Sequence, residues 1–169
     1  MTAASADRRG DWMPPSAQQR LALLRDARTI AIVGASPNPN RSSYFVATYL
    51  RANSSYRLFF VNPVVDEILG EPSYASLAAL PETPDVIDVF RRPQDLGDVT
   101  DEAIDRGSRV LWFQLGLVDM GCAAQATEHG MSVVMDRCLK IEHARFKGGL
   151  HLAGFDTGVI SSRRAPLLG

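Results

Sequence analysis

Five short apolar runs, each followed by a polar turn, constrain the fold of this chain more than any other feature. The runs occupy residues 29–34, 58–61, 84–90, 110–113 and 132–135. Each has the length and the nearly continuous apolar character of a strand that is buried on both faces of a sheet. Helix-like segments lie between the runs, and parallel strands need helical crossovers, so their order predicts a parallel sheet of at least five strands.

Capping residues mark where the helices begin and end. Ser16 can cap a leading helix before the first strand. Three further helices are predicted, over residues 43–52, 93–106 and 119–129. Gly107 and Gly130 can close the last two, because glycine adopts positive φ easily. We therefore expect an α/β fold of the Rossmann-like, doubly wound type: a single domain with a mainly parallel sheet and helices on both faces.

The predicted domain covers residues 15–145 and leaves an extension at each end. Residues 1–14 show no apolar periodicity, and we expect them to form a flexible tail. Residues 146–169 are expected to be a partly disordered C-terminal extension, since residues 140–151 give only a weak helix signal before paired glycines. One domain suits the length of 169 residues, because a chain of about 150 residues buries roughly 70% of its unfolded surface.

Composition and charge exclude several classes of function. Lysine and arginine (18) nearly balance aspartate and glutamate (19), so no overall field attracts nucleic acid or an anionic membrane. No apolar stretch approaches the 18 residues of a membrane span, and residues 1–12 lack a signal peptide's apolar segment, so we expect a cytoplasmic protein. Cys122 and Cys138 are too few for a disulfide framework and are expected to be free thiols.

The loop over residues 34–43 is the strongest candidate site, because ligands of open parallel sheets bind beyond the carboxyl ends of the strands. Its small residues lead into a helix N-terminus, where free backbone N–H groups and the helix dipole attract phosphate. Arg41 adds a charged contact, and Ser36, Ser42 and Ser43 add hydroxyl donors. In the alternative interpretation, Ser42 or Ser43 simply caps the helix.

The loop departs from the dinucleotide-binding pattern GxGxxG. Only its first glycine, Gly34, is present, and Ser36 stands where the second glycine would let a pyrophosphate approach the backbone. The second strand ends at Asn62 and Pro63, where NAD-binding proteins usually place an acid that holds the ribose. These departures argue against a divergent NAD(P)-binding oxidoreductase, which remains an alternative.

Six segments in order carry a resemblance to a known family. They are residues 33–36 with 41–43, then 61–63, 67–74, 85–93, 110–116 and 133–138. In them the chain resembles the coenzyme A (CoA)-binding domain proteins related to the N-terminal domain of the succinyl-CoA synthetase α subunit. The resemblance covers about residues 29–142.

The resemblance implies coenzyme A as the bound cofactor and assigns places to its parts. The CoA diphosphate would lie on Gly34, Ala35 and Ser36, with Arg41 and Ser42 nearby. Asn62 and Pro63 would border the adenosine, and Phe90, Arg91 and Arg92 would follow the next strand beside the cofactor. CoA carries a diphosphate and a ribose 3′-phosphate, which the three arginines could offset. Alternatively, Arg91 and Arg92 are simply solvated.

Two later strand ends could face the pantetheine arm or an acyl group. Gln114, Leu115 and Gly116 follow one strand, and Asp136–Cys138 (residues 136–138) follow the last. A polar strand end with a turn glycine is the alternative for the first. For Cys138 the alternative is a buried structural thiol, the commoner environment of cysteine.

The sequence favours a binding module over an enzyme and offers no catalytic residue or metal site. The phosphohistidine domain of the synthetase has no room here, and no histidine is paired with an evident nucleophile. The GxSxG, HExxH and Walker lysine motifs are all missing. We expect a protein that binds CoA or acyl-CoA, as a sensor or as a carrier for a partner enzyme, alone or as a homo-oligomer. The enzymatic alternative is a CoA-dependent transferase or ligase component that uses Cys138.

Overall fold

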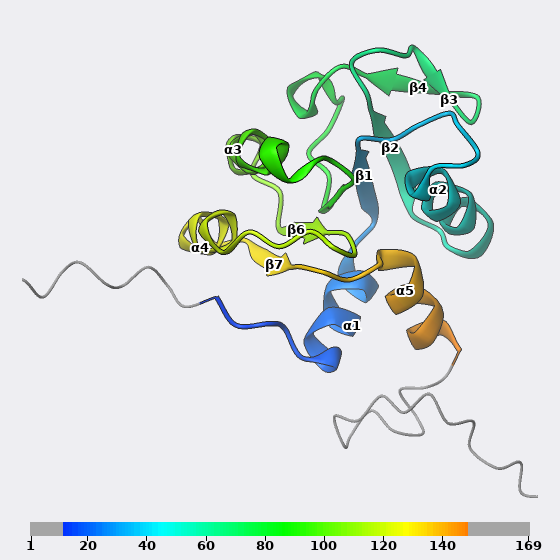
Figure 1. Cartoon of the computed structure of the whole chain (residues 1–169). Coiled ribbons are helices and arrows are strands. Elements are labelled where there is room, and N and C mark those ends of the chain that lie inside the picture. Colours follow the sequence, from blue (N-terminus) through cyan, green and yellow to red (C-terminus); the bar gives the residue numbers. More distant parts are fainter. Residues whose placement is uncertain (1–11, 149–169) are drawn as a thin grey trace, which may run out of the picture.

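A seven-stranded sheet crosses the middle of the structure, a computed structural model that describes residues 12–148 (Figure 1). Its strands are β1 (Thr29–Val33), β2 (Arg57–Val61), β3 (Glu67–Ile68), β4 (Glu71–Tyr74), β5 (Val86–Val89), β6 (Val110–Phe113) and β7 (Ser132–Val134). They lie in the order β3-β4-β2-β1-β5-β6-β7, and every pair is parallel except β3 with β4. The predicted α/β fold is confirmed.

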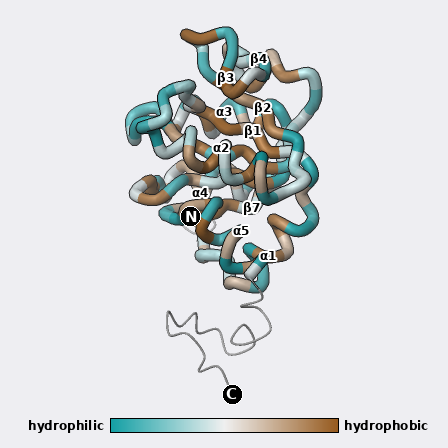
Figure 2. Tube along the Cα trace, turned by 90° about the vertical axis from the view of Figure 1, so that its right-hand side faces the viewer, coloured by the Kyte–Doolittle hydropathy of each residue, from teal (hydrophilic) through white to brown (hydrophobic). Residues whose placement is uncertain are grey.

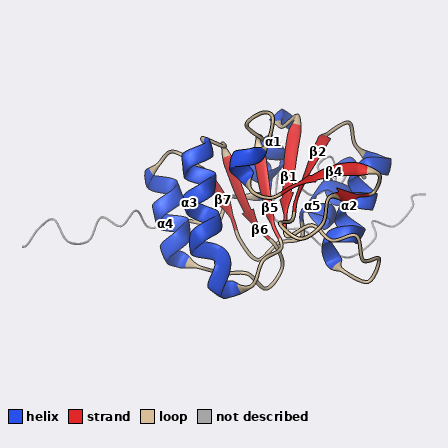
Figure 3. Ribbon diagram, turned by 90° about the horizontal axis from the view of Figure 1, so that it is seen from above, coloured by secondary structure: helices blue, strands red, loops and turns tan. Residues whose placement is uncertain are grey.

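Helices cover both faces of this sheet. They are α1 (Ala17–Asp26), α2 (Ser42–Asn53), α3 (Leu96–Arg106), α4 (Met120–Glu128) and α5 (Leu139–Lys147). Two short 3₁₀ turns, η1 (Leu77–Ala79) and η2 (Pro93–Asp95), lie in the connections. Helices α3 and α4 pack on one face, and α2 and α5 lie on the other together with α1 (Figures 1 and 3). This is the doubly wound arrangement that the parallel strands require.

The alternating side chains of the strands build one hydrophobic core on each face. In β6, Leu111 and Phe113 join the core beneath α3 and α4, whereas Trp112 joins the core beneath α1, α2 and α5. All three side chains are fully buried. Hydrophobic segments accordingly cross the middle of the molecule in Figure 2. Burial on both faces explains why the strands are continuous apolar runs in the sequence.

The first helix follows its capping signal. The Ser16 hydroxyl accepts a hydrogen bond from Gln19 N at 3.1 Å, and the Gln19 side chain accepts one from Ser16 N at 2.7 Å. This reciprocal pair is a capping box. One turn later, Arg20 is buried and donates to Glu142 of α5 at 2.8 Å. Helix α1 is therefore joined to α5 by a buried ion pair.

The shortest strands and one helix start differ from the expectation. Strands β3 and β4 have two and four residues, too short and too polar to show as apolar runs. Leu69 and Gly70 turn the chain between them with φ of 53° and 77°. The helix predicted over residues 93–106 begins as the 3₁₀ turn η2 and becomes α-helical only at Leu96.

Both predicted extensions fall mainly outside the described residues. Residues 1–11 and 149–169 are not described, so flexibility there stays a prediction. Trp12, which we assigned to the flexible tail, packs partly buried against the core, and its Nε1 donates to Val133 O at 2.8 Å. The weak helix signal after residue 139 corresponds to the nine-residue helix α5.

Candidate functional site

The connections after β1 and β5 meet at the carboxyl edge of the sheet. From these neighbouring strands the chain turns in opposite directions, to β2 on one side and to β6 on the other. This is the topological switch point, where open α/β sheets bind their ligands. At the meeting point Gly34 has a φ of +82°, and a Cβ there would lie 2.2 Å from the carbonyl oxygen of Phe90. Only glycine therefore allows the two connections to approach so closely.

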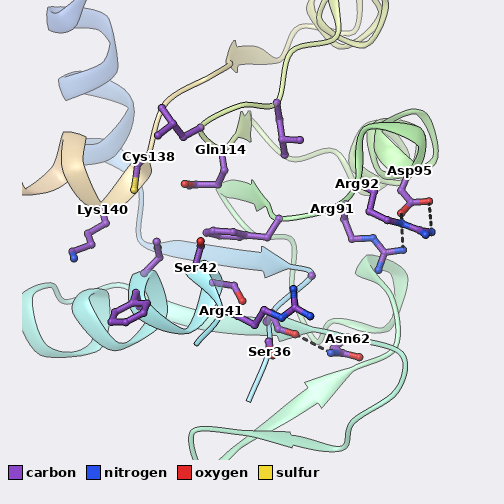
Figure 4. A pocket seen from close by; sticks show the side chains of 18 of the residues that line it. Ser36, Arg41, Ser42, Asn62, Arg91, Arg92, Asp95, Gln114, Cys138 and Lys140 are labelled. Carbon is purple, nitrogen blue, oxygen red and sulfur yellow. Dashed lines mark hydrogen bonds and ion pairs between the residues drawn. The ribbon is translucent and has the colours of Figure 1, made fainter. Parts of the chain in front are cut away.

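A cavity of about 810 Å³ opens at this switch point, and Figure 4 shows its walls. All eleven residues predicted for the cofactor line it: Gly34, Ala35, Ser36, Arg41, Ser42, Ser43, Asn62, Pro63, Phe90, Arg91 and Arg92. The structure thus brings together, in one place, loops that are more than 50 residues apart in the sequence. Their roles toward a ligand stay predictions.

The loop after β1 is braced by its own polar side chains. Ser36 Oγ accepts a hydrogen bond from Asn38 N at 3.1 Å, and Asn38 Oδ1 accepts one from Asn40 N at 3.0 Å. Asn62, at the end of β2, donates from Nδ2 to Ala35 O at 2.8 Å and accepts from Val64 N at 2.8 Å. The Asn62 side chain therefore fixes the backbone around the cavity, a role that the sequence alone did not indicate.

No side chain caps the N-terminus of α2 at the edge of the cavity. The N-cap residue is Arg41, whose side chain makes no capping hydrogen bond. Ser42 and Ser43 lie inside the first turn, so the alternative in which one of them caps the helix is wrong. Both line the cavity, Ser42 exposed and Ser43 buried. The positive end of the helix dipole is therefore available to an anion.

Three arginines line the cavity at this end, namely Arg41, Arg91 and Arg92. Arg41 is exposed and has no ion-pair partner within residues 12–148. Arg91 and Arg92 both reach Asp95, at 3.6 Å and 3.0 Å (Figure 4). The hydrogen bond from Arg92 lowers the pKa of Asp95. Asp95 also lines the cavity and escaped the sequence analysis, although its spacing of three and four residues from the arginines is a known ion-pair spacing.

The other end of the cavity contains the later strand ends. Gln114 and Leu115 after β6, and Cys138 before α5, line the cavity, as the rule of strand ends predicts. Gly116, Asp136 and Arg137, from the same two predicted segments, are not among its lining residues. Cys138 is half-buried, and both cysteines are free thiols. Several apolar lining residues were missed, namely Phe45 and Val46 of α2, Leu117, and Ile141 of α5. The two on α2 lie three and four residues after Ser42, so helical spacing was the available signal.

The described histidines make structural contacts away from this cavity. His143 lies against Tyr49 and Tyr56, and its Nδ1 is 3.0 Å from Tyr49 Oη. Burial lowers the pKa of His143. Between Trp12 and Gly148 there is no group of three His, Cys, Asp or Glu side chains that could hold a metal ion. Over the same span, no helix combines the length and the apolar character needed to cross a membrane.

The fold and the position of the cavity define a Rossmann-like ligand-binding domain, in which the ligand site lies beyond the carboxyl ends of the parallel strands. Residues 28–144 match the family described as CoA binding domain. This match covers most of the chain, and the protein belongs to that family.

Two relatives and one more distant solved structure are similar to this chain. The uncharacterized protein YneT of Bacillus subtilis is 35% identical over 130 residues, which cover 77% of this chain and 96% of YneT. The solved structure of a protein from Thermus thermophilus is 38% identical, with a TM-score of 0.73. The match covers 78% of this chain and 98% of the Thermus chain. A dinucleotide-forming acetyl-coenzyme A synthetase of Ca. Korarchaeum cryptofilum shares the fold, with 23% identity and a TM-score of 0.59. The match covers 67% of this chain and 26% of the synthetase chain.

Proposed function

We propose that this protein binds coenzyme A or an acyl-CoA in the cavity at the switch point and has no catalytic machinery of its own. The observation that carries the proposal is the composition of that one cavity. It combines an uncapped helix N-terminus, a glycine turn and three arginines at one end with apolar residues, the thiol of Cys138, Gln114 and Lys140 at the other (Figure 4). CoA has the same division, since its phosphates are at one end and its pantetheine arm at the other.

The diphosphate is assigned to the loop after β1. Gly34, Ala35 and Ser36 have small side chains that let a phosphate approach the backbone, and the N-terminus of α2 adds free N–H groups. Arg41, with Ser42 and Ser43, supplies charged and hydroxyl donors beside it. Backbone donors and an arginine together are a known arrangement for binding phosphate.

The 3′-phosphate distinguishes CoA from NAD, since both ligands contain an adenosine diphosphate. Arg91 and Arg92 exceed the charge of their shared partner Asp95 by one unit, which leaves net positive charge for a further phosphate. At the end of β2, where NAD-binding proteins place an acid that holds the ribose, this chain has the neutral Asn62, whose side chain is engaged with the backbone. Pro63 offers an exposed apolar surface to the base.

The thiol of Cys138 supports a second candidate, a CoA-dependent transferase or ligase component. Cys138 lines the cavity, half-buried, at the end assigned to the pantetheine arm. A thioester could pass its acyl group to this sulfur, with CoA thiol leaving. Incubation with acetyl-CoA followed by intact-protein mass spectrometry tests this, with Cys138→Ala as the control. Acetylation that requires Cys138 would establish the transfer.

Thermal unfolding with a panel of ligands tests the main proposal. The panel contains CoA, dephospho-CoA, acetyl-CoA, NAD and NADP. A ligand at about one hundred times its Kd stabilises the folded state by about 2.7 kcal/mol. We expect CoA and acetyl-CoA to raise Tm, and dephospho-CoA to raise it less because it lacks the 3′-phosphate. Stabilisation by NAD without stabilisation by CoA would contradict the proposal.

A further inference from the structure

Asp88 is a buried acid that the fold does not require. It lies in the central strand β5, between Ile32 of β1 and Trp112 of β6, and its exposed fraction is 0%. The other residues of β5 are Val86, Ile87 and Val89, all buried. An apolar residue at this position would avoid the cost of burying a carboxyl group. The acid therefore needs an explanation outside the packing of the sheet.

The hydrogen-bond partner of Asp88 is Gln114. In the structure Gln114 Nε2 donates a hydrogen bond to Asp88 Oδ1, and both side chains are buried. The second oxygen, Oδ2, has no hydrogen-bond partner in the described part of the chain, and no lysine, arginine or histidine there forms an ion pair with the carboxyl group. Burial raises the pKa of Asp88 to about 8. The carboxyl group is therefore mainly protonated at neutral pH.

A protonated carboxyl group determines how Gln114 is turned. Its O–H must find an acceptor, because a buried donor without a partner is costly. The carboxamide oxygen of Gln114 satisfies it when the amide is turned over, which moves no heavy atom because the amide oxygen and nitrogen occupy equivalent positions. In that orientation Asp88 donates to Gln114 Oε1, and Gln114 Nε2 is free to donate elsewhere.

The free end of Gln114 faces the ligand cavity. Gln114 lines the cavity although its exposed fraction is only 6%. Figure 4 shows the end of its side chain directed into the cavity, on the side where Cys138 lies. The atom at that end is the amide oxygen, and turning the amide over puts the NH₂ group in its place. The polar contact is thus placed on the wall of the cavity assigned to the arm of the ligand, away from Arg91 and Arg92.

We propose that Asp88 is a positioning residue that holds the Gln114 carboxamide with its NH₂ group directed into the cavity, where it donates a hydrogen bond to a carbonyl oxygen on the arm of the ligand. This inference rests on the proposed CoA binding and names the ligand group that the far wall selects. The pantetheine arm has two amide carbonyls, and an acyl-CoA adds a thioester carbonyl. Gln114 distinguishes such ligands from nucleotides that lack a carbonyl-bearing arm.

The test compares CoA with adenosine 3′-phosphate 5′-diphosphate, which has the phosphates and lacks the arm. Titration calorimetry gives Kd for both ligands with the wild type and four variants. Gln114→Met removes the donor, and Asp88→Val removes the group that orients it. Asp88→Asn keeps a donor toward Gln114 Oε1. Thr100→Val, a buried change on the opposite face, is the control for general packing effects.

The expected result is a loss confined to the ligand that carries the arm. Gln114→Met weakens the binding of CoA about tenfold, which corresponds to the loss of one hydrogen bond, and leaves the Kd of the shorter ligand unchanged. Asp88→Val weakens CoA several-fold, whereas Asp88→Asn and Thr100→Val bind like the wild type. Equal losses for both ligands, or an Asp88→Asn loss as large as that of Asp88→Val, would overturn the inference. If the wild type binds neither ligand, the proposed CoA binding itself fails.

A direct readout of the orientation comes from NMR of the CoA complex. The side-chain NH₂ signals of Gln114 are identified by their disappearance in Gln114→Met. We expect nuclear Overhauser contacts from these protons to the pantetheine arm. Contacts to protein protons around Asp88 and none to the ligand would show the opposite orientation and overturn the inference.

Discussion

Replacing Asp88 by asparagine should change the pH dependence of stability in a specific way. In the folded protein, burial raises the pKa of Asp88 from 3.8 to about 8. Between these two values the folded state keeps a proton that the unfolded state has lost. Stability therefore falls as pH rises through this window, by about 1.4 kcal/mol per pH unit for one group. Above about pH 8 both states are ionised, and the loss stops growing.

The magnitude at neutral pH follows from the same values. At pH 7 the wild type has crossed about three pH units of the window, which corresponds to about 4 kcal/mol. Asparagine does not ionise and avoids this loss, but its own buried amide offsets part of the gain by about 1–3 kcal/mol. We expect Asp88→Asn to be less stable than or equal to the wild type at pH 4.5 and more stable at pH 8.

Urea unfolding at half-unit steps from pH 4.5 to pH 9 measures this difference. Subtracting the two free energies of unfolding at each pH removes the contributions of all other titrating groups. The difference should rise in favour of the variant up to about pH 8 and then level off. A difference that is constant over the whole range would refute the raised pKa, and with it the protonated state on which the orientation of Gln114 depends.

Three further predictions concern the cavity and its supports. Gly34→Ala forces a Cβ against a backbone carbonyl at positive φ, so the free energy of unfolding in urea should fall by at least about 1–3 kcal/mol. The control Gly97→Ala in α3, where a Cβ meets nothing, should leave this free energy unchanged or raise it. Arg41→Ala should weaken CoA binding about tenfold or more in calorimetry and leave Tm unchanged. An equal loss of affinity in Arg25→Ala, on the distant helix α1, would contradict a direct contact of Arg41 with CoA. Glu142→Ala should cost about 3–5 kcal/mol in urea unfolding because it leaves the Arg20 charge buried, and a cost below about 1 kcal/mol would contradict that reasoning.

The long elements of the fold were predictable because their signals are local. The predicted run over residues 110–113 has the same bounds as the strand β6, because a strand that is buried on both faces needs an unbroken apolar segment. The loop residues of the site were predictable because parallel strands bring their carboxyl ends to one edge. Cys138, in the connection from β7 to α5, lines the same cavity for this reason.

Contacts between distant residues were not predictable. In the sequence, Asp88 in the run over residues 84–90 looks like any polar residue in a strand, and only the packing shows that its carboxyl group is buried. Asn62 was assigned by its neutrality, yet its side chain braces Ala35 across 27 residues. Strands β3 and β4 are too short for periodicity, and the ion pair of Arg20 with Glu142 joins the two ends of the domain.

The close approach at Gly34 has a consequence for how the cavity adapts to ligands. The carbonyl of Phe90 occupies the space that a side chain at residue 34 would need, so the two loops are in close backbone contact there. Gly34 N also donates to Val61 O at 3.0 Å and Phe90 N to Val33 O at 2.8 Å, so the sheet holds the start of each loop in place. The other end of the cavity differs, because Leu115 and Ile141 line it with exposed side chains. Under the proposed CoA binding, the part that all CoA thioesters share would meet the fixed backbone, and the acyl group that differs among them would meet these exposed side chains.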